Sequence, residues 1–100
     1  MVTHIVMWKF KEEVPESERE MRKDEMEKSF YALKDAVPEI KECQFIRKPL
    51  DSSTHDIALI VKVNCPMCLK KYIENEFHQA TANKYVRPFV TERASMDFED

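Results

Sequence analysis

The chain has 100 residues, of which 43% are hydrophobic and 35% are charged, and its formal net charge is -3 at pH 7. A chain of this length holds one hydrophobic core, so we expect a single domain over residues 1–100, and the apolar content excludes a disordered protein. Acidic and basic residues are interspersed, which leaves no extended basic surface and argues against a nucleic acid partner.

The N-terminal segment and the cysteines indicate the cellular compartment. The sequence begins directly with alternating apolar residues, without the charged segment and continuous apolar run of a secretory signal peptide. No apolar stretch approaches the length needed to span a membrane. The three cysteines do not form the even-numbered framework of a disulfide-rich secreted domain. We therefore expect a cytoplasmic protein with reduced thiols and no membrane partner.

Residues 2–10 are rich in β-branched and aromatic side chains and predict a first strand. Alternation places five of its side chains on one face, namely Val2, His4, Val6, Trp8 and Phe10. Ile5 and Met7 point to the other face, so both faces are apolar. A long helix is predicted from about residue 15 to residue 37, because Met26, Phe30 and Leu33 repeat at helical spacing.

Two further strands are predicted in the middle of the chain. Residues 40–48 place apolar side chains between charged ones, which is typical of a more exposed strand. Residues 49–54 contain Pro, Asp and Ser and predict a turn. The run HDIALIVKV, residues 55–63, is the strongest strand pattern in the sequence and is apolar on both faces.

The last part of the sequence predicts helical segments and a final strand. Residues 64–68 lead into a helix that contains Tyr72, and a further helical segment covers about residues 77–86. The final strand is predicted over residues 90–98. Its apolar side chains Ala94, Met96 and Phe98 share one face.

The order strand, helix, strand, strand, helix, strand predicts an α+β, ferredoxin-like βαββαβ fold with an antiparallel four-stranded sheet. Right-handed crossovers place the helices on the same face of that sheet, so the other face is left without cover. A second copy of the chain is the simplest cover, because burying about four to six apolar side chains, at roughly 1.5 to 3 kcal/mol each, outweighs the entropy lost on association. We therefore expect a homodimer that associates through the sheet face.

The residue inventory argues against a metal or an organic cofactor. The chain contains no Gly, which excludes glycine-dependent phosphate loops and dinucleotide fingerprints. His4, His55 and His78 are scattered and lack the close spacing typical of a metal site. Cys65 and Cys68 form the motif CPMC at a strand-to-helix junction, where a helix N-terminus can lower a thiol pKa. A thiol redox protein is therefore one alternative function, and an unperturbed Cys65 thiol would argue against it.

Several segments, taken in order, resemble the stress-responsive A/B barrel domain family, also called Dabb. They are VTHIVMWKFKEEV, AVPEIK, THDIALIVKV, KKYIENEFHQATANKYVRPFV and TERASMDFE, and they cover nearly the whole chain. The resemblance implies a dimeric α+β barrel in which two ferredoxin-like sheets face each other. The family includes plant polyketide cyclases that use a His and a Tyr in a cleft between sheet and helices.

The segment YIENEFH retains Tyr72 and His78 at the separation of that cyclase pair. The resemblance thus implies His78 as a general base and Tyr72 as the group that orients it or donates to a developing oxyanion. Many members carry a His-Pro pair just before the second His, whereas this chain has Asn75, Glu76 and Phe77. One continuous helix would place Tyr72 and His78 on different faces, but a break near Asn75 would bring them together.

Four further residues are predicted to line the same cleft: His4, Val6, Trp8 and Phe30. The resulting hypothesis is a homodimer that binds a small apolar or aromatic molecule, with cofactor-independent, cyclase- or isomerase-like proton transfer as its enzyme version. The alternative is a non-catalytic, stress-related structural or binding module. In that case the cleft is packed shut, His4 is a core residue bonded to a backbone carbonyl, and His78 only caps a helix.

Overall fold

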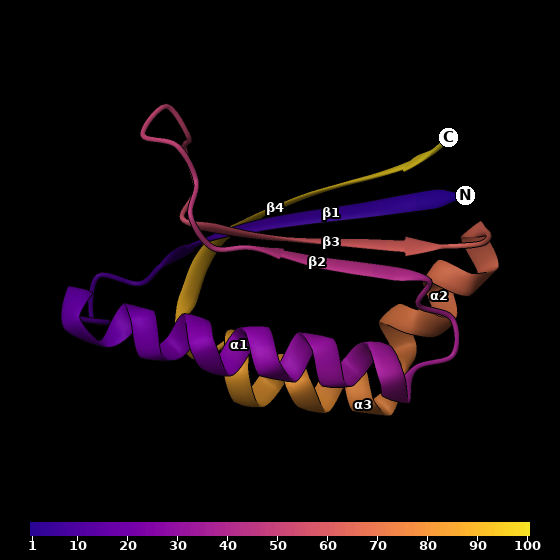
Figure 1. The fold of residues 1–100 in the computed structure, drawn as a ribbon, viewed down its shortest axis with the longest axis horizontal. Coiled ribbons are helices and arrows are strands. Elements are labelled where there is room, and N and C mark those ends of the chain that lie inside the picture. Colours follow the sequence, from indigo (N-terminus) through magenta and orange to yellow (C-terminus); the bar gives the residue numbers. More distant parts are fainter.

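The computed structural model describes residues 1–100 as one four-stranded sheet with helices on one side. The elements are β1 (Val2–Phe10), α1 (Glu16–Ala36), β2 (Glu42–Ile46), β3 (Ile57–Val63), α2 (Pro66–Glu74), α3 (Glu76–Thr81), the π-helical turn η1 (Ala82–Val86) and β4 (Val90–Glu99). All neighbouring strands are antiparallel, in the order β2-β3-β1-β4. The helices cover a single face of the sheet (Figure 1), so the predicted ferredoxin-like fold is confirmed.

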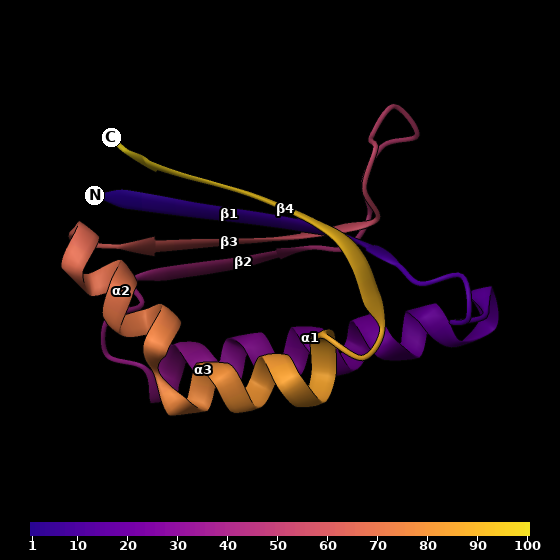
Figure 2. The same cartoon turned by 180° about the vertical axis from the view of Figure 1, so that it is seen from behind.

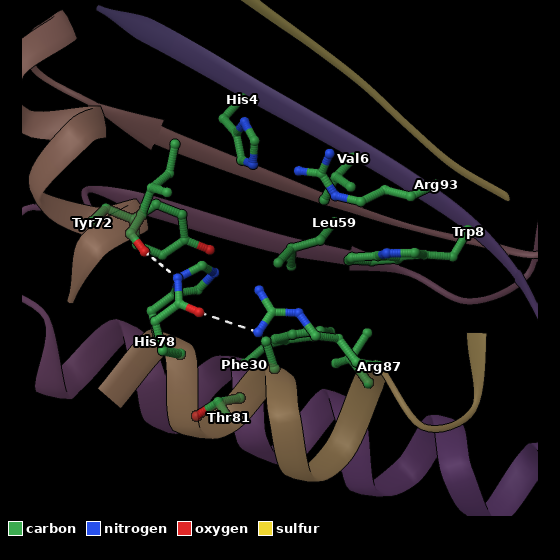
Figure 3. Close-up of a pocket in the computed structure, with 14 residues that line it drawn as sticks. His4, Val6, Trp8, Phe30, Leu59, Tyr72, His78, Thr81, Arg87 and Arg93 are labelled. Atoms are coloured by element: carbon green, nitrogen blue, oxygen red, sulfur yellow. Dashed lines mark hydrogen bonds between the residues drawn. The ribbon is translucent and has the colours of Figure 1, made fainter. Parts of the chain in front are cut away.

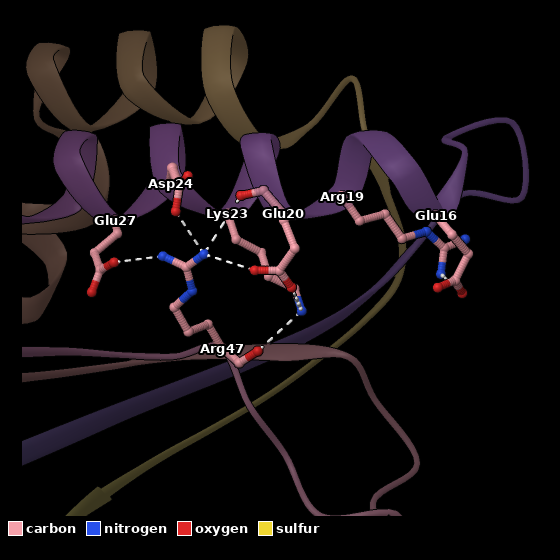
Figure 4. A network of polar contacts seen from close by, with 7 residues as sticks. All are labelled: Glu16, Arg19, Glu20, Lys23, Asp24, Glu27 and Arg47. Carbon is pink, nitrogen blue, oxygen red and sulfur yellow. Dashed lines mark hydrogen bonds and ion pairs between the residues drawn. The ribbon is translucent and has the colours of Figure 1, made fainter.

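The boundaries follow from local chemistry. Helix α1 begins after Pro15, whose fixed φ suits a helix start, and its first turn carries Glu16 and Glu18 near the positive end of the helix dipole. Strand β2 is shorter than the predicted range of residues 40–48, because the chain leaves the sheet at Arg47. That side chain lies between β2 and α1 and contacts three carboxylates of the helix (Figure 4), those of Glu20, Asp24 and Glu27.

The hydrophobic core lies between the sheet and the helices. Alternate residues of β1 and β3 face the helices and are buried: Val2, Val6, Trp8, Phe10, Ile57, Leu59, Val61 and Val63. Helix α1 meets them with Met26, Phe30 and Leu33, and α2 adds Leu69 and Tyr72. Burial of this apolar surface is the main force that holds the two layers together.

Strand β4 contains a bulge that changes which of its side chains face the helices. Met7 of β1 pairs with Ala94, but Lys9, only two residues later, pairs with Thr91, which lies three residues earlier on β4. The extra residue is accommodated at Glu92, whose backbone φ is 50°. Because side chains alternate along a strand, one extra residue reverses the alternation beyond it.

The reversed alternation divides the last part of β4 between the two faces of the sheet. Arg93, Ser95 and Asp97 share the face of the helix-facing residues of β1, since His4 is paired with Asp97 and Val6 with Ser95. Ala94, Met96 and Phe98 share the opposite face, as the sequence predicted. This division follows directly from the position of the bulge.

The face of the sheet away from the helices has no cover within the chain. Its central side chains come from all four strands: Ile46, Ala58, Ile60, Ile5, Met7, Ala94, Met96 and Phe98. The most accessible is Met96, which is 66% exposed. The loop between β2 and β3 rises on this uncovered side (Figure 2). None of the helices combines the length and apolar character needed to cross a membrane.

Candidate functional site

A cavity of about 190 Å³ lies between the sheet and the helices. Its apolar wall is built from β1, β3, α1 and η1: Val6, Trp8, Leu59, Phe30, Ala82 and Val86. The rings of Trp8 and Phe30 lie almost parallel, with 6° between their planes and 6.4 Å between their centroids. The structure therefore brings all four predicted cleft residues, His4, Val6, Trp8 and Phe30, to the wall of one cavity.

A break between α2 and α3 brings Tyr72 and His78 together. Helix α2 ends at Glu74, and the extended backbone of Asn75 turns the chain before α3 starts. The Asn75 side chain accepts hydrogen bonds from the backbone N–H groups of Phe77, at 2.8 Å, and of His78, at 3.3 Å. The two rings thereby approach to 4.4 Å between centroids. Both side chains line the cavity (Figure 3).

The hydrogen bonding of His78 sets its protonation. Its Nδ1 lies 3.0 Å from the carbonyl oxygen of Ile73, and because a carbonyl only accepts, Nδ1 must carry the proton. In the neutral ring Nε2 then holds a free lone pair. Burial lowers the pKa of His78 from its ordinary value of 6.5, and the positive charges of Arg87 and Arg93 lower it further. The neutral, proton-accepting form is thus favoured at neutral pH.

Tyr72 is held as a neutral phenol. Its side chain is buried, and this burial raises the pKa of its hydroxyl above the ordinary value of 10.0. No group of the chain bonds to that hydroxyl, which faces the cavity and is available as a hydrogen-bond donor. The ring also packs edge-on against His4, with 6.1 Å between centroids.

His4 has a different partner from the backbone carbonyl considered in the sequence analysis. Its Nδ1 bonds to the carboxylate of Asp97, its neighbour across β1 and β4. Since the carboxylate accepts, Nδ1 donates and Nε2 is left for the cavity. His4 and His78 therefore line one cavity although they are far apart in the sequence. His55 lies elsewhere, bonded to the Glu92 carbonyl oxygen at 3.1 Å.

Two arginines at the cavity were not predicted from the sequence. Arg87 follows η1, and Arg93 follows the bulge of β4, and both are exposed at the opening of the cavity. The reversed alternation after Glu92 turns Arg93 toward the cavity. The sequence carries only a partial signal, because Arg93, Ser95 and Asp97 alternate with the apolar side chains of Ala94, Met96 and Phe98. The structure adds that this polar side of the edge strand faces the helices, which leaves the site open to solvent.

A family model described as the stress responsive A/B barrel domain, Dabb, matches residues 2–100. The chain belongs to this family. No curated protein sequence matches this Dabb protein. The membership agrees with the resemblance of the sequence segments and with the ferredoxin-like order of strands and helices.

Solved structures resemble this Dabb protein over almost its whole length. A dimeric protein of unknown function from Bacteroides fragilis has 24% identity and a TM-score of 0.88, covering 99% of this chain and 95% of that chain. A dimeric ferredoxin-like protein of unknown function from Thermobifida fusca has 19% identity and a TM-score of 0.78, covering 97% and 88%. A Dabb family protein from Mesorhizobium loti has 13% identity and a TM-score of 0.76, covering 99% and 95%. At these identities the likeness shows the fold alone.

The Dabb chain also carries a close pair of thiols outside the cavity. The sulfur atoms of Cys65 and Cys68 are 2.6 Å apart, and the Cys65 sulfur accepts from the Cys68 backbone N–H at the start of α2. Hydrogen bonds from Cys68 lower the pKa of Cys65. Thiol exchange at this pair stays a prediction. No group of three or more His, Cys, Asp or Glu side chains is arranged to hold a metal ion.

Proposed function

We propose that this Dabb protein binds a small aromatic or otherwise apolar molecule in the cavity and that His78 moves a proton at an activated carbon of that molecule. The observation that carries the proposal is the contact of the His78 imidazole with the Tyr72 phenol at the wall of an apolar cavity. The reaction class is cyclase- or isomerase-like proton transfer, which these side chains support without a cofactor.

The roles of the two side chains follow from their protonation. The Nε2 lone pair of His78 accepts the proton of an acidic C–H group, and the electron pair of that bond moves toward an oxygen of the ligand. The Tyr72 hydroxyl donates a hydrogen bond to the oxygen on which negative charge develops. The same His78 returns the proton to another carbon or to an oxygen, so the ligand is rearranged without net oxidation.

The size of the cavity supports a ligand of about one ring. An apolar cavity of about 150 Å³ is known to accept benzene, and the cavity here has a volume of about 190 Å³. It is also open to solvent at the arginine side, rather than packed shut as the structural-module alternative requires. A non-catalytic binding protein is the remaining alternative, because binding alone needs only the cavity.

We also infer that two copies of the chain associate through the uncovered face of the sheet. Ile5, Ile60 and Met96 form one apolar row across β3, β1 and β4, and no element of the same chain covers that row. A contiguous apolar surface of this kind is typical of a protein interface. Two of the similar structures, from Bacteroides fragilis and Thermobifida fusca, are dimeric proteins, which supports the inference.

Proton abstraction is tested with 5-nitrobenzisoxazole, a small neutral ring system that opens to a coloured phenolate when a general base removes its C–H proton. The wild-type protein is expected to accelerate this opening, and His78→Ala is expected to lower kcat/KM by at least about 100-fold, since general base catalysis contributes that much. Tyr72→Phe is expected to lower the rate as well, because it removes the donor to the developing oxyanion.

Phe77→Ala is the matched control, because it truncates the exposed neighbour of His78 on the same short helix. This variant should keep the wild-type rate, and circular dichroism should show that all variants are folded. A folded His78→Ala protein with more than half of the wild-type rate would remove His78 from the mechanism. Binding of the probe with no acceleration by the wild-type protein would favour the binding module.

A further inference from the structure

The arginines of the chain fall into two groups. Three of them are paired with carboxylates. Arg22 lies 3.4 Å from Glu25. Figure 4 shows the other two: Arg19 lies 3.6 Å from Glu16, and Arg47 lies 2.7 Å from both Asp24 and Glu27. Arg87 and Arg93 have no carboxylate within ion-pair distance. These two unpaired arginines are the two that line the cavity.

Arg87 is held at the cavity by neutral partners. Its Nη1 atom donates to the side-chain oxygens of Gln79, at 3.1 Å, and of Asn83, at 2.5 Å. Both partners are amides, which orient the guanidinium group but do not neutralise its charge. The remaining N–H groups of Arg87 are therefore available to a ligand.

Arg93 faces Arg87 from the other side of the cavity. Figure 3 shows the two side chains at the same cavity, with the Arg93 guanidinium group beside the sheet and the Arg87 guanidinium group beside the helical layer. Two like charges at one cavity without a counterion repel each other, and a bound anion would relieve this repulsion. Arg93 bonds only to the hydroxyl of Ser95, at 3.4 Å, which again leaves its charge unpaired.

The surrounding groups do not supply the missing negative charge. No Asp or Glu lines the cavity. The carboxylate of Asp97 is engaged by His4. The positive charges also reach the interior, because both arginines contribute to the lowered pKa of His78. An anion near the opening of the cavity is therefore favoured electrostatically.

The geometry points to a small ring compound with one carboxylate group as the ligand of this cavity. The ring lies against the apolar wall around Trp8 and Val86, and the carboxylate accepts hydrogen bonds from Arg87 and Arg93 at the opening. This inference rests on the proposed function for the existence of the ligand site and adds the charge of the ligand. Planar guanidinium groups suit a carboxylate, because they donate two parallel hydrogen bonds to it.

The test compares benzoate with benzyl alcohol, a neutral compound of similar shape, in NMR titrations of the backbone amides of the full chain. Benzoate is expected to bind at least about ten-fold more tightly than benzyl alcohol, since each charge-assisted hydrogen bond is stronger than a neutral one. Arg87→Gln and Arg93→Gln should each weaken benzoate binding by about three- to ten-fold, a range that allows for solvent screening at the opening. Neither variant should change the affinity for benzyl alcohol by more than about two-fold.

Lys84→Gln is the control for net charge, because it removes one positive charge from the same π-helical turn at a residue that does not line the cavity. It should leave both affinities unchanged. Equal affinities for benzoate and benzyl alcohol, unaffected by the arginine variants, would overturn the anion inference and leave the proposed ligand site standing. Absence of amide shifts around the cavity with either compound at millimolar concentration would overturn both.

Discussion

At the scale of single residues, the site depends on how two side chains are kept neutral. The Tyr72 phenol is neutral at neutral pH even at its ordinary pKa of 10.0, and burial raises this pKa further, whereas His78 is neutral because burial and two nearby guanidinium charges disfavour the imidazolium form. The carbonyl of Ile73 opposes this effect, since it accepts from Nδ1 and stabilises the protonated ring. Burial and the arginines outweigh that carbonyl, so the ring remains a proton acceptor.

The first prediction concerns the pH dependence of stability. The pKa of His78 is lowered in the folded protein, so between this value and the unfolded value of about 6.5 the unfolded chain binds more protons. The contribution of neutral His78 to stability is thus fully present above about pH 6.5 and is lost as the pH falls toward the folded pKa. An NMR titration of the His78 ring should give a midpoint below 6.5.

The variant His78→Gln isolates this contribution, because glutamine can still donate to the Ile73 carbonyl but does not titrate. In urea denaturation, the free energy of unfolding of the wild-type protein relative to His78→Gln should decrease from pH 7.5 to pH 5.5. A ring titration midpoint above 6.5 would contradict the prediction.

At the scale of secondary structure, the bulge of β4 determines which side chains of that strand line the site. Without the extra residue at Glu92, Arg93 would point to the uncovered face of the sheet and Ala94 would point to the cavity. The bulge has a cost, because Glu92 adopts a positive φ that is unfavourable for a residue with a Cβ atom. His55 supports it by donating to the Glu92 carbonyl oxygen.

The second prediction tests this strain. Glu92→Gly should be more stable than Glu92→Val by about 1 to 2 kcal/mol, because glycine accepts a positive φ and a β-branched residue does not. Thr91, the neighbouring residue on the same strand, is the matched control. There the order should be reversed, with Thr91→Val more stable than Thr91→Gly, because its backbone has no positive φ. The measurement is the free energy of unfolding in urea. If the Gly and Val variants had the same order of stability at both positions, backbone strain at Glu92 would be excluded.

The elements themselves could be predicted from the sequence, because hydrophobic alternation and helical spacing depend only on nearby residues. The same holds for the meeting of Tyr72 and His78, since Asn75 is a residue type that commonly interrupts and caps helices. Arg87 and Arg93 could not be predicted. Their directions depend on the π-helical turn and the bulge, and neither feature carries a glycine that would mark it in the sequence.

The hydrogen-bond partner of His4 could not be predicted from the sequence either. Asp97 lies at the far end of the chain, and its pairing with His4 requires both the antiparallel register of β1 with β4 and the reversed alternation beyond the bulge. The alternation of polar residues in β4 indicated which side chains share a face. It did not indicate that this polar face is turned toward the helices.

At the scale of the whole molecule, the chain consists of two layers, with apolar side chains on both sides of the strand layer. Helices cover one side only, and the loop between β2 and β3 rises beside the other (Figure 2). Covering this second side by another copy would bury Met96 and its neighbours, at about 1.5 to 3 kcal/mol for each fully buried side chain. Association is therefore expected at micromolar concentration.

The third prediction is that Met96→Glu weakens or abolishes the dimer. The wild-type protein should show twice the monomer mass in size-exclusion chromatography with light scattering, and the variant should show the monomer mass, because a buried, unpaired carboxylate is costly. Met21→Glu is the matched control, since Met21 is also an exposed methionine, at 43%, but lies on α1 away from the open face. A wild-type monomer, or a dimer that tolerates Met96→Glu, would exclude this interface.

Because of the single added residue in β4, a change in the length of that strand would affect two separate surfaces. Beyond Glu92 the odd-numbered side chains serve the ligand cavity and the even-numbered ones serve the uncovered face. Deleting or inserting one residue between Val90 and Ala94 would exchange these two groups of side chains. Polar and charged side chains would then lie on the uncovered face, and apolar side chains would lie at the cavity. Relatives that keep both surfaces are therefore expected to differ here by substitution and not by length.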